Sequence, residues 1–238
     1  MQFFRRLAPV KAFSFDLDDT FYDNHPYIVE AEKQLFAFMT TQWPQVAELG
    51  RPAWRRFRAR SIVENPLYAH DMIALRKSVL DKMFSAIGLQ GEDLRDAAQQ
   101  SYDVFYFHRS NFVVNPEYVA LLQELAAKYP VIAITNGNVD IARVGLKDCF
   151  HHVFHASTVL RSKPYRDMFD AASKACGVAP RNILHVGDNL EKDVGGAIKA
   201  GFQAAWYAEN RPMNLNHEAT QQLPHVALGA LAELKQLV

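Results

Sequence analysis

Short apolar runs alternate with longer segments of helical periodicity along most of this chain. Five such runs, at residues 12–15, 131–135, 153–156, 183–186 and 204–207, have the length of strands. A short, nearly continuous apolar run is typical of a strand that is buried on both faces of a sheet. Strands that alternate with helices indicate parallel βαβ units with right-handed crossovers. The pattern therefore predicts an α/β fold with a doubly wound parallel sheet at its core.

One helix is marked by start signals at its N-terminus. Asn115 provides a cap and Pro116 follows at the first helical position, and apolar residues then recur at helical spacing. Near the other end of the chain, residues 209–224 are rich in Asn and Pro and predict a surface loop. A final helix is expected after this loop, ending at Val238.

The alternation of strands and helices stops between residues 23 and 112. This interval has no convincing strand, and its apolar residues recur at helical steps. It is too long to be a simple connection between two elements of one sheet. We therefore predict an all-helical domain at residues 23–112, inserted into a core that consists of residues 1–22 and 113–238.

Composition narrows the possible functions. The chain has 238 residues, 49% of them hydrophobic, with 26 basic and 26 acidic residues. A formal net charge of zero argues against a general binder of nucleic acids or anionic membranes, which needs a positive field. Cys149 and Cys176 fit neither a metal site nor a disulfide framework, and no apolar run is long enough to span a bilayer. We expect a cytoplasmic protein, with no membrane or nucleic-acid partner.

The first strand is followed at once by acidic residues. Asp16 and Asp18 stand two positions apart in the string Asp16-Leu17-Asp18-Asp19-Thr20. Ligands of open α/β sheets bind beyond the carboxyl ends of the strands, and two neighbouring carboxylates favour a cation between them. A nucleophilic or metal-binding Asp16 with an acid or base at Asp18 is one interpretation. A polar turn that caps the next helix is the other.

Three later motifs also follow predicted strands. Thr135-Asn136-Gly137 offers a hydroxyl and a tight turn whose amides suit a phosphate oxygen, Lys163 precedes a proline, and Asp188 and Asp193 follow the strand at 183–186. Each has a plain structural alternative, namely a turn, a solvated lysine and a helix cap. Taken together, the motifs favour a functional site over these structural alternatives, because adjacent parallel strands would bring Asp16, Thr135, Lys163 and Asp188 to one edge of the sheet.

These four motifs resemble those of the haloacid dehalogenase-like superfamily. The resemblance covers residues 1–22 and about 113–238, and it implies a Rossmann-like core with a helical cap domain placed after the first motif. It also implies a Mg²⁺ cofactor, held by Asp16, Asp188 and the main-chain carbonyl of Asp18, and an aspartyl-phosphate intermediate.

The same resemblance assigns a role to each motif residue. Asp16 becomes the nucleophile, and Asp18 the acid that protonates the leaving alcohol and then activates water. Thr135 and the Asn136 amide hold the phosphoryl group, and Lys163 balances charge. Asp193 either ligates through water or orients Lys163.

Asp18 indicates phosphate-ester chemistry within this superfamily, because members that displace halide from carbon do not resemble the chain at this position. The flanks of the motifs, such as Phe21-Tyr22-Asp23-Asn24 and Arg161-Ser162-Lys163-Pro164, resemble a bacterial branch that acts on FMN and on 5-amino-6-(5-phospho-D-ribitylamino)uracil. A small phosphorylated metabolite is therefore the expected partner. A phosphomutase, a sugar or nucleotide phosphatase and a non-catalytic binding module remain alternatives, and the sequence predicts no oligomeric state.

Three further clusters have both a functional and a structural interpretation. The aromatic stretch at residues 102–108 would stack on a flavin or pyrimidine ring, but such a stretch is more often core. The arginine-rich helix at residues 51–60 would steer anions, but a solvated face is the better interpretation. His151, His152 and His155 suggest zinc, yet no cysteine or carboxylate pattern supports them.

Overall fold

The computed structural model describes residues 1–218 and 220–237 of the chain. Its centre is a seven-stranded sheet with the strand order β1-β7-β6-β5-β2-β3-β4. All neighbouring strands are parallel except β1 and β7. The strands are β1 (Gln2–Phe3), β2 (Ala12–Phe15), β3 (Val131–Thr135), β4 (His152–His155), β5 (Ile183–Gly187), β6 (Gln203–Trp206) and β7 (Val226–Ala227).

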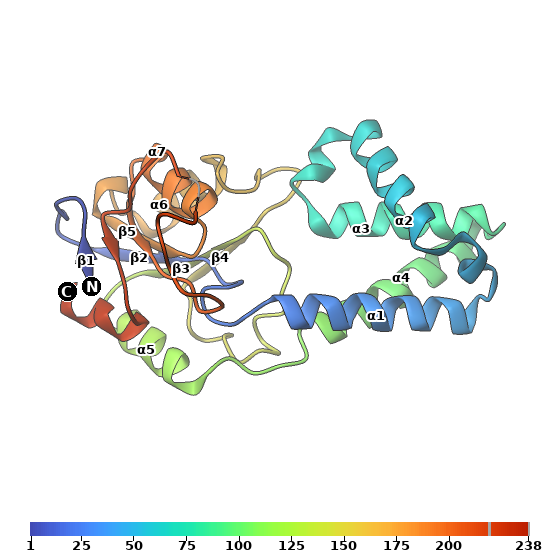
Figure 1. The fold of residues 1–238 in the computed structure, drawn as a ribbon, viewed down its shortest axis with the longest axis horizontal. Coiled ribbons are helices and arrows are strands. Elements are labelled where there is room, and N and C mark those ends of the chain that lie inside the picture. Colours follow the sequence, from blue (N-terminus) through green and yellow to red (C-terminus); the bar gives the residue numbers. More distant parts are fainter. Residues whose placement is uncertain (219, 238) are drawn as a thin grey trace.

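Helices cover both faces of the sheet (Figure 1). On one face lie α5 (Pro116–Ala126) and a 3₁₀ helix (Leu231–Leu237), and on the other lie α6 (Asp167–Cys176) and α7 (Gly196–Lys199). Successive side chains of a strand point to opposite faces, so β3 supplies Val131 and Ala133 to one core and Ile132 and Ile134 to the other. The predicted α/β class with a doubly wound, mostly parallel sheet is confirmed.

The predicted start of α5 is also confirmed. The Asn115 side chain accepts a hydrogen bond of 3.0 Å from the main-chain N–H of Glu117, and Pro116 occupies the first turn. Leu122 and Leu125 then lie buried against the sheet. The N-cap residue Asn115 determines where α5 begins, and the apolar face of α5 determines how the helix packs on the sheet.

Four helices form a second body beside the sheet (Figure 1). They are α1 (His25–Gln42), α2 (Gln45–Glu64), α3 (Met72–Ala86) and α4 (Gly91–Arg109), with a short 3₁₀ helix (Pro66–Ala69) before α3. They enclose a separate apolar cluster, which includes Leu35, Leu80, Phe84 and Phe105. The inserted helical cap is therefore present, while its boundaries at residues 22/23 and 112/113 stay a prediction.

Several predicted elements differ in detail from the observed ones. β4 and β6 each begin and end one residue earlier than expected. The reason is that their hydrogen-bonded pairing with the neighbouring strand starts at a polar residue, His152 opposite Ile132 of β3 and Gln203 opposite Leu184 of β5. The two-residue strands β1 and β7 were not predicted, since two residues carry no periodicity. The expected final helix is the 3₁₀ helix Leu231–Leu237, and Val238 lies outside the described residues. Within the part of the chain that is described, no helix combines the length and hydropathy needed to cross a membrane.

Candidate active site

Three of the predicted site residues lie at the carboxyl ends of neighbouring strands. β2 lies between β5 and β3, and Phe15 at the end of β2 is in register with Val186 and Ala133. This register brings Asp16, Thr135 and Asp188 to the same edge of the sheet. They line one small cavity of about 180 Å³, shared with Asp18, Asp19, Asn24, Asn136, Gly137, Lys163, Asn189, Lys192 and Asp193.

Lys163 is the central cation of this cavity. Its Nζ lies 2.7 Å from Asp16 Oδ1 and 2.6 Å from Asp193 Oδ1, and it donates a hydrogen bond of 2.7 Å to the Ile134 carbonyl. Burial raises the pKa of Asp16 well above its usual range, and the lysine opposes that rise. Burial alone would lower the pKa of Lys163, but the carboxylates of Asp16 and Asp193 outweigh it and raise this pKa. The lysine is therefore held as a fixed positive charge between two carboxylates.

Asp193 is bonded on both carboxylate oxygens. Besides Lys163, its Oδ1 lies 3.2 Å from His185 Nε2, and its Oδ2 accepts a hydrogen bond of 3.0 Å from the Asn189 N–H. His185 is buried and its Nδ1 lies 2.9 Å from the Ser14 hydroxyl. Burial would raise the pKa of Asp193, but Lys163 and His185 hold it below its usual range. The contact with Lys163 is compatible with an orienting role for Asp193, and both predicted roles stay predictions.

Asp188 is bound by an arginine that the sequence did not single out. Arg211 Nη1 lies 2.9 Å from Asp188 Oδ2, and its Nη2 donates to the Asp188 carbonyl at 2.9 Å. The same guanidinium is paired with Glu218 at 3.0 Å. Burial and the neighbouring Asp193 raise the pKa of Asp188 to about 6, against the effect of Arg211. Proton uptake at this carboxylate therefore falls close to neutral pH.

The acidic residues fit a hard divalent cation. Asp16, Asp188 and Asp193 are all buried, and each offers a carboxylate oxygen within 4.8 Å of the others. Carboxylate oxygens are the ligands that Mg²⁺ prefers in proteins. Asp18 contributes no side-chain oxygen to this group, and its role through the main-chain carbonyl stays a prediction. No histidine belongs to any such group among the described residues, so the zinc interpretation gains no support.

Asp18 lies across the cavity and is held from the cap side. Its Oδ1 accepts hydrogen bonds from Tyr22 at 2.6 Å and from Arg109 Nη2 at 2.5 Å. Arg109 is fully buried at the end of α4, so the cap itself supplies this contact. On the other side, Asp18 Oδ2 lies so close to Gly137 that a Cβ there would be 2.3 Å away. One carboxylate oxygen is thus fixed and the other faces the glycine turn.

The Thr135 hydroxyl is bonded to a residue that follows it. The Thr135 hydroxyl accepts a hydrogen bond of 3.0 Å from the Gly137 N–H. The Asn136 side chain accepts from Lys163 N at 2.7 Å and donates to the Lys163 carbonyl at 3.1 Å. Its side-chain amide therefore ties the Thr135 turn to the loop that carries Lys163.

Two more contacts join the cap to the core beside the cavity. His70 Nδ1 lies 2.9 Å from the Ser162 hydroxyl, next to Lys163, and Asp71 Oδ2 accepts a hydrogen bond of 3.2 Å from Thr158 N. The aromatic stretch at residues 102–108 is only partly buried. Tyr102 and Phe105 lie in the core of the cap, whereas Phe107 is 40% exposed. The arginines of residues 51–60 lie on an exposed helix face, as expected.

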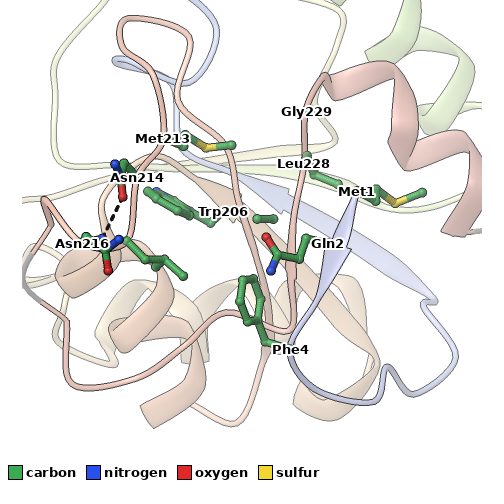
Figure 2. A pocket seen from close by; sticks show the side chains of 11 residues that line it. Met1, Gln2, Phe4, Trp206, Met213, Asn214, Asn216, Leu228 and Gly229 are labelled. Atoms are coloured by element: carbon green, nitrogen blue, oxygen red, sulfur yellow. Dashed lines mark hydrogen bonds between the residues drawn. The ribbon is translucent and has the colours of Figure 1, made fainter.

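A second hollow lies away from these residues, at the β1 and β7 edge of the sheet (Figure 2). It has a volume of about 530 Å³ and is lined by Trp206, Met213 and Phe4, among others. None of its lining side chains is acidic or basic. It offers neither a nucleophile nor a ligand set for a cation, so the smaller acidic cavity is the candidate active site.

Similarity to known proteins agrees with this geometry. Over its full length the chain is 34% identical to the 5-amino-6-(5-phospho-D-ribitylamino)uracil phosphatase YigB of Escherichia coli, and it also covers all of that protein. A crystal structure described as a 2-haloacid dehalogenase from Pseudomonas syringae superimposes with a TM-score of 0.87 at 31% identity, covering 96% of this chain and 97% of that one. The magnesium-bound hydrolase YfnB of Bacillus subtilis shares the fold, with a TM-score of 0.61 at 18% identity over 97% and 99% of the two chains.

The family itself is identified by a match that covers most of the core and all of the cap. Residues 10–201 match the model of haloacid dehalogenase-like hydrolases, so they include Asp16, Thr135, Lys163 and Asp188. The predicted membership and the predicted class of enzyme, a phosphatase of this superfamily, are confirmed. The chain belongs to the haloacid dehalogenase-like hydrolases.

Proposed function

We propose that this enzyme hydrolyses phosphomonoesters of small metabolites with the help of Mg²⁺, through a phosphoryl group carried on Asp16. The observation that carries the proposal is the arrangement of two carboxylates with different partners at one cavity. Asp16 is paired with the buried Lys163, while Asp18 is held by Tyr22 and Arg109. One carboxylate can then serve as nucleophile and the other as acid and base.

The metal would be held by Asp16, Asp188 and the main-chain carbonyl of Asp18. When bound, Mg²⁺ neutralises charge on the phosphoryl oxygens. Lys163 holds Asp16 Oδ1, so Oδ2 is the oxygen that forms the new bond to phosphorus as the ester bond breaks. Thr135 and the Asn136 N–H hold the phosphoryl oxygens during this transfer.

Asp18 moves the protons of both half-reactions. In the first, its Oδ2 gives a proton to the leaving alkoxide. In the second, the same oxygen takes a proton from the water that attacks the phosphorus, which releases phosphate and regenerates Asp16. Because Oδ1 accepts hydrogen bonds from Tyr22 and Arg109, the proton is carried by the oxygen on the Gly137 side.

The description of the Pseudomonas syringae relative at 31% identity names another reaction, dehalogenation. Halide leaves carbon without needing a proton, so that reaction has no use for an acid at Asp18. The three residues committed to positioning this carboxylate, namely Tyr22, Arg109 and Gly137, therefore support phosphate-ester hydrolysis instead. Chloride release from 2-chloropropionate would test the alternative directly.

We further propose that the substrate belongs to flavin metabolism, either FMN or 5-amino-6-(5-phospho-D-ribitylamino)uracil. Full-length identity of 34% to the Escherichia coli phosphatase supports this choice. The phosphomutase and the sugar or nucleotide phosphatase remain the competing assignments within the superfamily.

Phosphate release from a panel of flavin, nucleotide and sugar phosphates tests these assignments, with Asp16→Asn as the inactive control. We expect FMN and the ribitylaminouracil phosphate among the best substrates. Strong release from sugar phosphates with none from FMN would overturn the flavin assignment alone. An isomerised sugar phosphate in place of free phosphate would identify a mutase. No release from any ester, with wild type and Asp16→Asn alike, would overturn the phosphatase proposal.

A further inference from the structure

Asp188 is held at its main chain by two donors. Arg211 Nη2 donates a hydrogen bond of 2.9 Å to the Asp188 carbonyl, and the indole Nε1 of the buried Trp206 donates another of 2.7 Å to the same oxygen. A carbonyl oxygen has two lone pairs, so both are used. The point from which the Asp188 side chain reaches the cavity is therefore fixed by contacts that do not involve its carboxylate.

The same arginine occupies one oxygen of the Asp188 carboxylate. Arg211 Nη1 lies 2.9 Å from Oδ2 and donates to the Asn210 side chain at 2.9 Å. Glu218 holds the guanidinium from another side, with Oε1 3.1 Å from Nε and Oε2 3.0 Å from Nη2. Glu218 and the Asp188 carbonyl thus keep the guanidinium beside Oδ2. Among the described residues no donor bonds to Oδ1, which is the oxygen left for a cation.

The other two carboxylates of the acidic group are restrained in a similar way. Lys163 Nζ occupies Oδ1 of Asp16 at 2.7 Å. Both oxygens of Asp193 have donors, with Lys163 at Oδ1 and the Asn189 N–H at Oδ2. Asp16 and Asp188 can therefore each offer one oxygen to a cation, and neither can offer two without breaking an ion pair.

Carboxylates that bind through one oxygen suit one kind of divalent cation. Mg²⁺ takes about six ligands in a near-ideal octahedron at about 2.1 Å and keeps several waters, so it needs few protein oxygens. Ca²⁺ takes about six to eight ligands at about 2.4 Å, and it often binds both oxygens of a carboxylate. A site that offers one oxygen from each carboxylate therefore meets the needs of Mg²⁺, whereas Ca²⁺ loses its two-oxygen contacts.

We propose that Arg211 makes the site selective for Mg²⁺ over Ca²⁺, because it takes Oδ2 of Asp188 and so prevents this carboxylate from binding a cation through both oxygens. This inference rests on the proposed function, since it concerns the cation that the proposed reaction uses. Arg211 acts through Asp188 and is a positioning residue. Its own place depends on Glu218, so the selectivity depends on Glu218 as well.

Calorimetric titration of the full chain with Mg²⁺ and with Ca²⁺ measures this selectivity without turnover. We expect wild type to bind Mg²⁺ at least about tenfold more tightly than Ca²⁺. Arg211→Met frees Oδ2 and is expected to lower the ratio of the two affinities about tenfold, because the loss of a group that orients a ligand costs about 10- to 100-fold in affinity for the cation that the geometry suits. The lost positive charge acts equally on two divalent cations, so it cancels in the ratio.

Two further variants complete the experiment. Glu218→Ala leaves the guanidinium in the chain but removes its second anchor, so it is expected to lower the ratio in the same direction, by about threefold. Arg166→Met is the matched control, because it removes an exposed arginine from an ion pair of 3.1 Å with Asp170, away from the cavity. It is expected to leave the ratio unchanged.

The ratio separates cation selection from a merely structural role of Arg211. If the arginine only stabilises the loop at residues 207–218, its loss weakens the binding of both cations alike, so an unchanged ratio in Arg211→Met overturns the inference. A wild type that binds both cations equally overturns it as well. Should Arg211→Met fail to fold, the ratio of Glu218→Ala decides in its place. In these cases phosphate release with Mg²⁺ leaves the proposed function standing, whereas a wild type that binds neither cation refutes both.

Discussion

Gly137 offers the sharpest test of how Asp18 works. A Cβ at this position would lie 2.3 Å from Asp18 Oδ2 and 3.2 Å from its Cγ. A non-bonded carbon and oxygen need about 3.3 Å, so Gly137→Ala must push the carboxylate away by about 1 Å. Tyr22 and Arg109 hold the other oxygen at 2.6 and 2.5 Å, and these bonds must stretch or break if the group moves. A displacement of about 1 Å at a catalytic group costs roughly 100-fold in rate.

Two substrates with different leaving groups show whether Gly137→Ala loses rate because acid catalysis by Asp18 is impaired. We expect kcat/KM of Gly137→Ala to fall about 100-fold for an alkyl phosphate, because its alkoxide must be protonated as it leaves. For p-nitrophenyl phosphate the expected loss is under about tenfold, since that leaving group departs without a proton. Gly229→Ala serves as the control, because this glycine is exposed and an added Cβ would lie no closer than 3.6 Å to any atom. Equal losses for both esters, or none, would refute the assignment of Asp18 as the acid.

Three more predictions concern the buried charges. Asp16→Asn should lower phosphate release at least about 1000-fold while circular dichroism shows an intact fold, because the amide cannot accept a phosphoryl group; retained turnover would contradict its role as nucleophile. Since the pKa of Asp188 is raised to about 6 and a protonated carboxyl does not ligate, calorimetric Mg²⁺ affinity should fall at least about tenfold per pH unit below about 6, and an unchanged affinity there would contradict its role as a ligand. Burial lowers the pKa of His185, so on acidification the unfolded chain binds a proton at this residue before the folded protein does. As the pH drops below about 6.5, the free energy of unfolding of wild type, measured in urea, should therefore fall relative to that of His185→Gln, by at most about 1.4 kcal/mol per pH unit. Equal pH dependence of the two unfolding free energies would refute this.

Local patterns were enough to predict the five longer strands of the sheet and the residues proposed for the site at their ends. The strands β2, β3 and β5 are buried on both faces, so their apolar runs stand out in the sequence. Asp16 and Asp188 directly follow strands and Thr135 ends one, so the parallel topology brings these three together, while Lys163 reaches them from a loop that begins after β4. The residues proposed to carry the chemistry could therefore be named from the sequence alone.

The residues that support this chemistry were missed, because their partners are distant in the chain. Arg109 lies 91 residues from Asp18, at the end of a helix whose other buried residues are small or aromatic. Arg211 lies in a loop that the sequence marks only as polar, 23 residues after Asp188. Only one signal was available in advance, namely that Arg109 occupies the apolar face of an amphipathic helix. A charge on such a face needs a counter-charge from another element, and the sequence does not say which.

The order of strands in the sheet also governs when the enzyme becomes active during its synthesis. β2 pairs with β5, which begins at Ile183, and the edge strand β1 pairs with β7 at Val226 and Ala227. The cap helices, in contrast, contact one another within residues 25–109 and have their own apolar core. At ribosomal speeds of about 5–20 residues per second, the cap leaves the ribosome several seconds before Asp188 does. The helical domain therefore emerges with its own apolar core complete, while Asp16 is without Asp188 and Asp193 until more than three quarters of the chain has been made.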